Sequence, residues 1–356
     1  MDGNWLYNGD NLDILREYVK DEAVDLVYLD PPFNSNQDYH IGSARNRGLR
    51  VSAGTTHGAT QASPPHIHTA PAPTRTIIHQ VFKDSWRWDQ EAAHAYQEIV
   101  EAGGRLAQAM QAFRQMLGAN DMLAYLAMMA PRLVELRRVL KSTGSIYLHC
   151  DPTASHYLKI LMDTIFGVSN FRNEIIWFYK TGGASKRHFS RKHDVILFYT
   201  KTDDYVFNAQ KEKSYMMHEY GFKKSDFQKD EQGQYTWVYM KDVWEIPSIG
   251  SADSQRLGYP TQKPLALLER IIGASSNAGD VVLDPFCGCG TTIDAAQRLE
   301  RRWIGIDITS IATNLIKTRL LDTYGEGITK TYKVRGEPTT YSEAQALAEF
   351  DKYQFQ

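Results

Sequence analysis

The chain has 356 residues, of which 42% are hydrophobic and 23% charged, and its formal net charge is −2. These values indicate a globular chain with one large α/β domain and an insertion, or with two domains. The low net charge excludes a uniformly basic protein, so any surface for nucleic acid must be local. Three cysteines are too few for a disulfide framework, and no signal peptide or apolar run of about 18 residues is present. We therefore expect a cytoplasmic protein that does not enter a membrane.

A strand–helix–strand unit opens the chain. We expect a short strand over residues 5–7, a helix that Asn11 caps and that runs to about residue 19, and a strand over residues 24–30. The second strand, VDLVYLD, is an almost continuous apolar run, which is typical of a strand buried in a parallel sheet. Ligands of open α/β sheets bind at the carboxyl ends of such strands, so the residues that follow are candidate site residues.

The strand is followed by a corner that consists of Asp30, Pro31, Pro32 and Phe33. The prolines have no N–H to continue a sheet, so the corner offers one carboxylate, unpaired carbonyls and an aromatic face. A carboxylate and a carbonyl can accept both hydrogens of an exocyclic amine while the aromatic ring stacks on the base that bears it. The alternative is an ordinary exit from a strand, with Asp-Pro-Pro as a turn and Phe33 in the core.

The composition changes over residues 42–80, which are rich in Gly, Ala, Thr, Ser, Pro and His and predict a mobile surface loop. Its histidines lack Cys or acidic companions at ligand spacing, so we predict no metal site at His57, His66, His68 and His79. The regular pattern then returns. We expect helices over residues 90–102, 121–140 and 154–165, and strands over residues 145–150, 174–179 and 194–200.

A basic stretch without any acid lies between the last two of these strands and contains Lys180, Lys186, Arg187, Arg191 and Lys192. Such a run is usually a solvated face, but beside a pocket for a base it would suit contacts with DNA phosphates. Residues 201–260 then alternate charged and aromatic positions without a sustained period, which indicates an added lobe. Residues 325–356 are polar and weakly helical and carry no motif.

A second group of candidate residues lies where the regular α/β pattern resumes, from residue 261. The strand DVVLD runs into Gly288 and Gly290 and then into a helix, and the next strand ends at Asp307, 23 positions after Asp284. Nucleotide-binding units place an acceptor for the ribose hydroxyls at about this spacing. The dinucleotide pattern fails at Ile293 and no phosphate-loop lysine is present, so an adenosine-containing ligand without phosphates is favoured over NAD or ATP. The alternative is a glycine turn that only packs a helix on a sheet.

Three motifs in this order resemble those of the S-adenosylmethionine-dependent DNA amino-methyltransferases, over most of residues 4–320. Asp30 to Phe33 resembles the catalytic D/N/S-P-P-Y/F/W motif, and Phe286, Gly288 and Gly290 resemble the F-x-G-x-G cofactor loop. Residues 261–264, TQKP, are similar to the T-x-K-P segment that precedes that loop. The catalytic motif comes first, as in the permuted β group. Residues 42–80 have no counterpart in the family pattern.

The resemblance implies an α/β fold, a doubly wound Rossmann-like methyltransferase sheet with a circularly permuted motif order. It implies a catalytic half over residues 1–171, an inserted target-recognition region over 172–260, a cofactor-binding half over 261–324 and a C-terminal extension over 325–356. The implied cofactor is S-adenosyl-L-methionine, with Asp307 on its ribose and Asp10 near its adenine. The full set of implied cofactor-binding residues is Asp10, Thr261, Lys263, Pro264, Asp284, Pro285, Phe286, Gly288, Gly290 and Asp307.

The resemblance and the chemistry of the corner predict the same reaction, methylation of the N6 amine of adenine in double-stranded DNA. The base would leave the duplex, stack on Phe33 and donate its amine hydrogens to Asp30 and to the carbonyl of Pro31, so that its nitrogen attacks the methyl group directly. Asp30 favours adenine over the N4 amine of cytosine, since the enzymes for cytosine more often have Ser there. An RNA base, a protein glutamine and a nucleotide-binding module without catalysis remain as alternatives.

The resemblance also bears on partners. It implies double-stranded DNA, and it leaves open a homodimer, a cognate restriction endonuclease and the recognition sequence. It implies a bacterial, archaeal or phage-encoded enzyme. Because direct transfer needs no covalent intermediate, we expect Cys287 and Cys289 to be small packing residues and Cys150 not to be a nucleophile.

Overall fold

The structure, a computed structural model, describes residues 3–32, 37–43, 77–84, 86–180, 184–215 and 223–337. In this part of the chain the first half contains β1 (Asn4–Asn8), α1 (Asn11–Tyr18), β2 (Val24–Leu29), β3 (Gln37–Ser43), β4 (Ile77–Asp84), α2 (Gln90–Ala102), α3 (Gly104–Leu117), α4 (Asp121–Val139), β5 (Leu140–Cys150) and α5 (Ser155–Phe166). The second half contains β6 (Phe171–Phe178), β7 (His193–Thr200), β8 (Lys211–Ser214), β9 (Gln228–Asp230), β10 (Gly233–Tyr239), β11 (Val243–Glu245), α6 (Leu265–Ser275), β12 (Val281–Asp284), α7 (Thr291–Arg298), β13 (Arg302–Asp307), α8 (Ser310–Tyr324) and β14 (Tyr332–Arg335). Short 3-10 turns lie at Val168–Asn170, Lys224–Asp226 and Glu326–Lys330.

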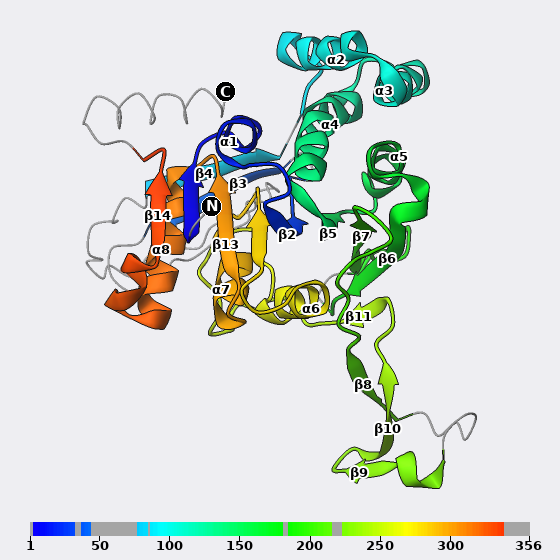
Figure 1. The fold of residues 1–356 in the computed structure, drawn as a ribbon, viewed down its shortest axis with the longest axis vertical. Coiled ribbons are helices and arrows are strands. Elements are labelled where there is room, and N and C mark those ends of the chain that lie inside the picture. Colours follow the sequence, from blue (N-terminus) through cyan, green and yellow to red (C-terminus); the bar gives the residue numbers. More distant parts are fainter. Residues whose placement is uncertain are drawn as a thin grey trace, which may run out of the picture.

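A nine-stranded sheet forms the centre of the molecule, in the order β11-β6-β7-β5-β2-β12-β13-β1-β14 (Figure 1). All neighbouring strands are parallel except at β7, which runs antiparallel to β5 and β6. Helices cover both faces of this sheet, so the predicted doubly wound α/β fold is confirmed.

Alternating side chains of each strand enter two separate cores, as the two-residue period of a strand requires. On β2, Val27 and Leu29 pack in the core that includes α1, α4 and α5, while Leu26 and Tyr28 pack in the core that includes α6, α7 and α8. Burial on both faces explains why this segment is apolar without alternation. Asp25 is the exception, and Lys141 and the N–H of Val281 hold its carboxylate.

The chain winds in opposite directions from the centre of the sheet. After β12 it proceeds through α7 to β13 on one side, and after β2 it reaches β5 on the other. The two central strands pair in parallel, with Leu283 opposite Val27. A crevice for ligands forms outside the carboxyl ends of the strands at such a switch point. The site is therefore expected where β2 and β12 end.

Several local predictions need correction. Asp10, not Asn11, caps α1, because its carboxylate accepts the N–H groups of Leu12 (2.7 Å) and Asp13 (3.4 Å). The helices α3 and α8 were not predicted. The C-terminal segment, expected to be weakly helical, supplies the edge strand β14. An edge strand pairs on one side only, so its sequence can be polar and gives no clear strand signal.

The expected loop over residues 42–80 begins and ends in regular structure. Strands β3 and β4 pair antiparallel, from Gln37 opposite Asp84 to Ser43 opposite Ile77. The apolar run TIIHQVF, residues 76–82, is the strand signal that the loop prediction overlooked. Residues 44–76, with His57, His66 and His68, lie outside the described residues.

The added lobe expected over residues 201–260 is smaller than predicted. Among the described residues of this segment, β8, β10 and β9 form a separate three-stranded sheet, which projects from the main body (Figure 1). Strand β11 rejoins the central sheet beside β6, and the proposed start of the recognition region at residue 172 falls within β6. In the described part of the chain no helix is long and apolar enough to cross a bilayer.

Candidate active site

The carboxyl ends of four adjacent strands bring the two predicted groups of residues together. Asp30 directly follows β2, and Asp10 comes shortly after the end of β1. Asp284 and Asp307 are the last residues of β12 and β13. Neighbouring strands lie about 4.8 Å apart, so residues some 250 positions apart in sequence line one edge of the sheet. The structure thus unites the catalytic corner with the glycine turn.

Asp30 presents one paired and one unpaired carboxylate oxygen. Its Oδ2 forms an ion pair with Lys263, whose side chain is 9% exposed. Its Oδ1 is buried and has no hydrogen-bond partner. A buried acceptor without a donor is costly, and it marks a position where a ligand N–H would be stabilised. Pro31 is buried next to it, whereas Phe33 lies outside the described residues.

Lys263 was predicted to contact the cofactor, and the structure shows that it also contacts the catalytic corner. Its ammonium group donates to the carbonyl oxygen of Thr261 at 3.4 Å as well as to Asp30. Pro264 follows and occupies the cap position of α6. Thr261 itself has φ +62°, a left-handed conformation that is rare for a β-branched residue. Such strain is most often found at functional sites.

Asp284 is buried at the end of β12, between the strand that precedes Asp30 and the strand that ends at Asp307. Its carboxylate accepts hydrogen bonds from the Thr292 hydroxyl (2.5 Å) and from the N–H of Phe286 (3.0 Å). Burial raises the pKa of Asp284 to about 7, against the effect of these hydrogen bonds, and the charges of Asp30 and Asp307 add to the rise. Three carboxylates are therefore close enough to repel one another, and the site suits a cation.

The glycine turn after β12 is ordered by Asp307. The carboxylate of Asp307 accepts the N–H of Gly288 at 2.9 Å through Oδ2, and the N–H and hydroxyl of Thr309, both at 2.9 Å, through Oδ1. Gly288 and Gly290 have φ of +49° and +77°. A Cβ on Gly290 would lie 2.6 Å from Ile316 of α8, so this glycine is required for the close approach of that helix.

The two cysteines of the turn are packing residues, as predicted. Both are free and buried, and burial raises the pKa of each thiol. The sulfur of Cys287 lies 3.2 Å from the position that a Cβ on Gly305 would occupy. A buried thiol with a raised pKa is a poor nucleophile.

Asp10 lies at the same edge and is held by a residue that sequence reasoning missed. Arg132 of α4 donates to Asp10 Oδ2 at 2.6 Å and to Asn11 Oδ1 at 2.5 Å. Asn11 in turn donates to the carbonyl of Pro285 at 2.8 Å. Arg132 thereby links the end of β1 to the start of the glycine turn. The sequence signal for Arg132 was the position of an arginine among the apolar residues of a predicted helix.

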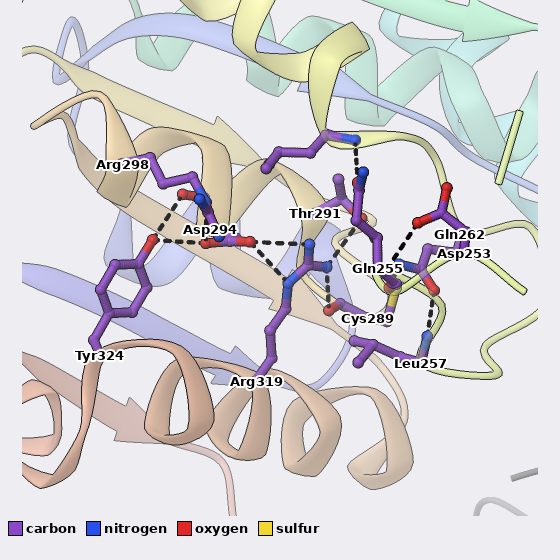
Figure 2. A network of polar contacts seen from close by, with 11 residues as sticks. Asp253, Gln255, Leu257, Gln262, Cys289, Thr291, Asp294, Arg298, Arg319 and Tyr324 are labelled. Atoms are coloured by element: carbon purple, nitrogen blue, oxygen red, sulfur yellow. Dashed lines mark hydrogen bonds and ion pairs between the residues drawn. The ribbon is translucent and has the colours of Figure 1, made fainter. Parts of the chain in front are cut away.

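A second arginine supports the turn from the other side. Arg319 of α8 is 7% exposed, and its guanidinium donates to Asp294 at 3.0 and 3.2 Å, to Thr291 at 3.1 Å and to the carbonyl of Cys289 at 3.3 Å. Figure 2 shows Arg319 between Asp294 and the turn, with Arg298 and Tyr324 on the far side of Asp294. The network ties α7, α8 and the cofactor loop together.

The segment before Thr261 packs over the same turn. The side chains of Gln255 and Gln262 hold it through bonds to the N–H of Leu265 and to the N–H of Leu257 (Figure 2). Tyr259 is buried, and a Cβ on Gly288 would lie 3.1 Å from its ring. Tyr259 was not predicted, since an aromatic residue in a segment without periodicity gives no signal.

A buried polar chain also lies behind Asp30. His149 of β5 is fully buried, with Nδ1 2.9 Å from the Tyr28 hydroxyl and Nε2 3.1 Å from Asp194. Burial acts to raise the pKa of Asp194, but the hydrogen bond and charge of His149, together with Lys263, lower it below its usual value. A histidine within the apolar strand SIYLHC was the sequence signal for this chain of contacts.

The basic stretch is a loop between β6 and β7 at the edge that carries Asp30. Strand β6 ends at this edge and β7 begins there, and the N–H of Tyr179 bonds to the carbonyl of Lys192 at 3.0 Å across the neck of the loop. Lys186, Arg187 and Arg191 are exposed. Lys180 pairs with Glu245 of β11, so its charge is partly offset. In the described residues no group of three or more His, Cys, Asp or Glu side chains could hold a metal ion.

Comparison with known proteins identifies the family. A family model described as DNA methylase, for N6 and N4 methyltransferases, matches residues 24–318. The chain belongs to this family of S-adenosylmethionine-dependent DNA amino-methyltransferases. The match includes the Asp30 corner, the T-x-K-P segment and the glycine turn, so the resemblance seen in the sequence is confirmed.

Individual relatives align with about half of this chain. Type II methyltransferase M.EcaI of Enterobacter cloacae is 30% identical in an alignment 260 residues long, which covers 55% of this chain and 57% of that protein. DNA adenine methyltransferase YhdJ of Escherichia coli (strain K12) is 33% identical over 183 residues, 50% of this chain and 60% of that protein. The chain thus spans somewhat more than half of the length of these curated relatives.

A solved structure of the same fold covers nearly the whole chain. The PvuII DNA methyltransferase (cytosine-N4-specific) superposes with a TM-score of 0.53 at 14% identity, over 99% of this chain and 92% of that one. This likeness concerns the fold alone.

The residues of the site fit the cofactor of the family, S-adenosyl-L-methionine. The turn over residues 284–291 contains no Lys or Arg, so it suits an adenosine that lacks phosphates. The mutual electrostatic effect of Asp30, Asp284 and Asp307 suits the positive charge of a sulfonium group. These residues lie at the edge formed by the carboxyl ends of β2, β12 and β13.

Proposed function

We propose that the chain methylates the N6 amine of adenine in double-stranded DNA, by flipping the base into the Asp30 corner and by direct attack of its nitrogen. The observation that carries the proposal is the buried, unpaired Oδ1 of Asp30 at the switch point of the sheet. An exocyclic amine is the donor that such an oxygen lacks. A base inside a duplex cannot reach a buried atom, so the base must leave the stack.

The chain's own residues orient and polarise the amine. Lys263 holds Oδ2 of Asp30, which leaves Oδ1 directed to an amine hydrogen, and the carbonyl of Pro31 would accept the second hydrogen. Accepting these hydrogens concentrates electron density on the nitrogen. S-adenosylmethionine supplies, when bound, a methyl group activated by its sulfonium. As the N–C bond forms and the C–S bond breaks, the surplus amine proton passes toward Asp30 or water.

The roles of the cofactor residues extend this proposal. Asp307 would accept the ribose hydroxyls beside Gly288, and Asp10 would lie near the cofactor adenine at the end of β1. Thr261, Lys263 and Pro264 would lie at the methionine end, since Lys263 touches the catalytic carboxylate. Phe33 would stack on the flipped base.

Adenine is preferred to cytosine for two reasons. The corner starts with Asp30, whereas enzymes for cytosine N4 more often have Ser at this position. A curated relative with 33% identity carries the name DNA adenine methyltransferase. The competing function is N4-cytosine methylation, because the family model covers both N6 and N4 methyltransferases. The type II names of other relatives support a role in restriction–modification.

The test is chemical identification of the product. The protein is incubated with unmethylated genomic DNA and labelled S-adenosylmethionine, and the DNA is digested to nucleosides. We expect label in N6-methyl-2′-deoxyadenosine. Label in N4-methyl-2′-deoxycytidine would overturn the choice of base, and no label in any nucleoside of the DNA would overturn the proposed activity.

A further inference from the structure

The loop between β6 and β7, residues 180–192 and here named the basic loop, presents an unusual aromatic side chain. Phe189 is 98% exposed, more than any other large hydrophobic residue in the described part of the chain. A single exposed apolar residue needs no explanation on most surfaces. The surroundings of Phe189 are what distinguish it.

Every charged residue of the basic loop is a cation. Lys186, Arg187 and Arg191 surround Phe189 in sequence and are exposed like it, and the loop contains no Asp or Glu. An aromatic ring among cations fits a polyanion with stacked bases, because the cations contact phosphates while the ring can stack. Double-stranded DNA offers both features.

Local hydrogen bonds fold this part of the loop into a defined turn. The Ser185 hydroxyl accepts the N–H groups of Arg187 (3.2 Å) and His188 (3.3 Å), and the N–H of Ser185 donates to the Ser190 hydroxyl (3.3 Å). His188 Nδ1 lies 2.9 Å from the carbonyl oxygen of Phe189. The turn therefore presents the Phe189 ring to solvent without any cover from its own neighbours.

The basic loop starts and ends at the edge of the sheet where the Asp30 corner lies. Strand β7 is separated from β2 by β5 alone, which corresponds to roughly 10 Å at the usual strand spacing. Proteins that distort DNA insert apolar side chains, including Phe, between base steps. Flipping a base leaves such a gap beside the active site, and stacking on one base typically strengthens binding about 5- to 150-fold.

We propose that Phe189 enters the DNA base stack in the space vacated by the target base, while Arg187 and Arg191 contact the flanking phosphates. This inference rests on the proposed function and adds the residue that stabilises the flipped state. Phe189 is a positioning residue, because it acts on the duplex rather than on the reacting amine. Its contribution should depend on how difficult the target pair is to open.

The test compares matched and mismatched duplexes under single-turnover conditions. The methylated site is first mapped on genomic DNA with the unaltered chain, and duplexes are made with the target base either paired or opposite a mismatch, which lowers the cost of flipping. For Phe189→Ala we expect methylation of the matched duplex to fall about tenfold, with less than threefold loss on the mismatched duplex. Phe189→Trp, which keeps a stacking ring, should remain within threefold on both.

Two controls separate this role from a general defect. Val168 is 69% exposed and precedes β6 at the opposite edge of the sheet, so Val168→Ala should leave both rates unchanged. Cofactor affinity should be the same in all variants. An equal loss on matched and mismatched duplexes, or no loss on either, would overturn the insertion of Phe189. Failure of the unaltered chain to methylate any DNA would instead overturn the proposed function and this inference with it.

Discussion

Asp30 and Lys263 form the smallest functional unit of the molecule. The ion pair occupies one carboxylate oxygen, and the other oxygen is buried without a donor. The partner of Asp30 lies 233 positions away in sequence, within the motif expected to contact the cofactor. The two motifs are therefore adjacent in the structure, where a single lysine connects the T-x-K-P segment to the Asp30 corner.

Substitution of two carboxylates should separate the two pockets. Asp30→Ala removes the acceptor of the amine, so we expect methyl transfer to be lost while the cofactor Kd stays within about tenfold. If Asp307 accepts the ribose hydroxyls as proposed, Asp307→Ala removes charged hydrogen bonds of about 1.5–3 kcal/mol and should weaken cofactor binding roughly 10- to 100-fold. Cofactor titration and single-turnover transfer measure the two effects.

Asp30→Asn is the matched control for Asp30→Ala, because asparagine keeps the volume of the side chain and one acceptor oxygen. Loss of cofactor binding in Asp30→Ala, with normal binding in Asp307→Ala, would contradict the division into two pockets.

Asp284 should make stability depend on pH. Its pKa of about 7 lies above the ordinary value of 3.8, so the folded protein holds this proton more tightly than the unfolded chain does. The stabilisation is complete below about pH 4 and is lost as the pH rises through 7. Between pH 5 and pH 8 this group should lower the free energy of unfolding by about 3 kcal/mol.

Asp284→Asn is the variant that tests this effect, since an amide does not titrate and can still accept the N–H of Phe286. Urea denaturation at pH 5 and pH 8 should show a smaller pH dependence for the variant than for the natural chain, by about the amount given. Equal pH dependence of the two proteins would mean that Asp284 is not the responsible group.

At the scale of elements, α8 fixes the cofactor loop through one buried arginine. Arg319 reaches from α8 to Asp294 of α7 and to the carbonyl of Cys289 in the turn. The same helix fills the space that Gly290 leaves, through Ile316. The glycine turn is thus shaped by a helix that was not predicted, rather than by the turn sequence alone.

Removing this arginine should destabilise both the fold and the turn. Arg319→Ala leaves the buried Asp294 with fewer partners, and we expect the free energy of unfolding to fall by about 3 kcal/mol and cofactor affinity to fall with it. Arg298 pairs with the same carboxylate but is 42% exposed, so Arg298→Ala should cost less than about 1 kcal/mol. Urea denaturation and cofactor titration give the comparison, and equal costs would contradict the role assigned to Arg319.

At the scale of the whole molecule, the chain combines a central sheet with a small projecting lobe. The lobe consists of β8, β10 and β9, and its exposed aromatic residues include Trp237 and Tyr239. Its two ends meet, because the N–H of Met240 bonds to the carbonyl of Gln210 at 3.1 Å. The lobe can therefore be removed without stretching the chain.

Deletion of residues 211–239, with two glycines joining Gln210 to Met240, should spare the cofactor site. We expect cofactor affinity within threefold of the intact chain, since the lobe shares no strand with the central sheet. Methylation of the mapped DNA site should fall at least tenfold if the lobe recognises the target. Unchanged methylation would place recognition elsewhere in residues 172–260.

Much of the central sheet could be predicted because its signals are local. The buried strands β2, β12 and β13 are apolar runs. Asp30 directly follows β2, and Asp284 and Asp307 are the last residues of β12 and β13. The predicted bounds of α2 are confirmed, since its apolar residues recur with the helical period. Strand β14 and helix α8 escaped prediction because tertiary contacts stabilise them in spite of weak local preference.

The sequence by itself determined the chemical groups of the site: a carboxylate and prolines at Asp30, a glycine turn, and Asp307 one strand later. Only the tertiary structure decided that β2 and β12 are neighbours, that Lys263 pairs with Asp30, and that Phe189 extends from a loop at the same edge. The physical reason is the range of the interactions. Backbone propensity and periodicity act within a few residues, whereas strand order and burial depend on contacts between segments that are hundreds of residues apart.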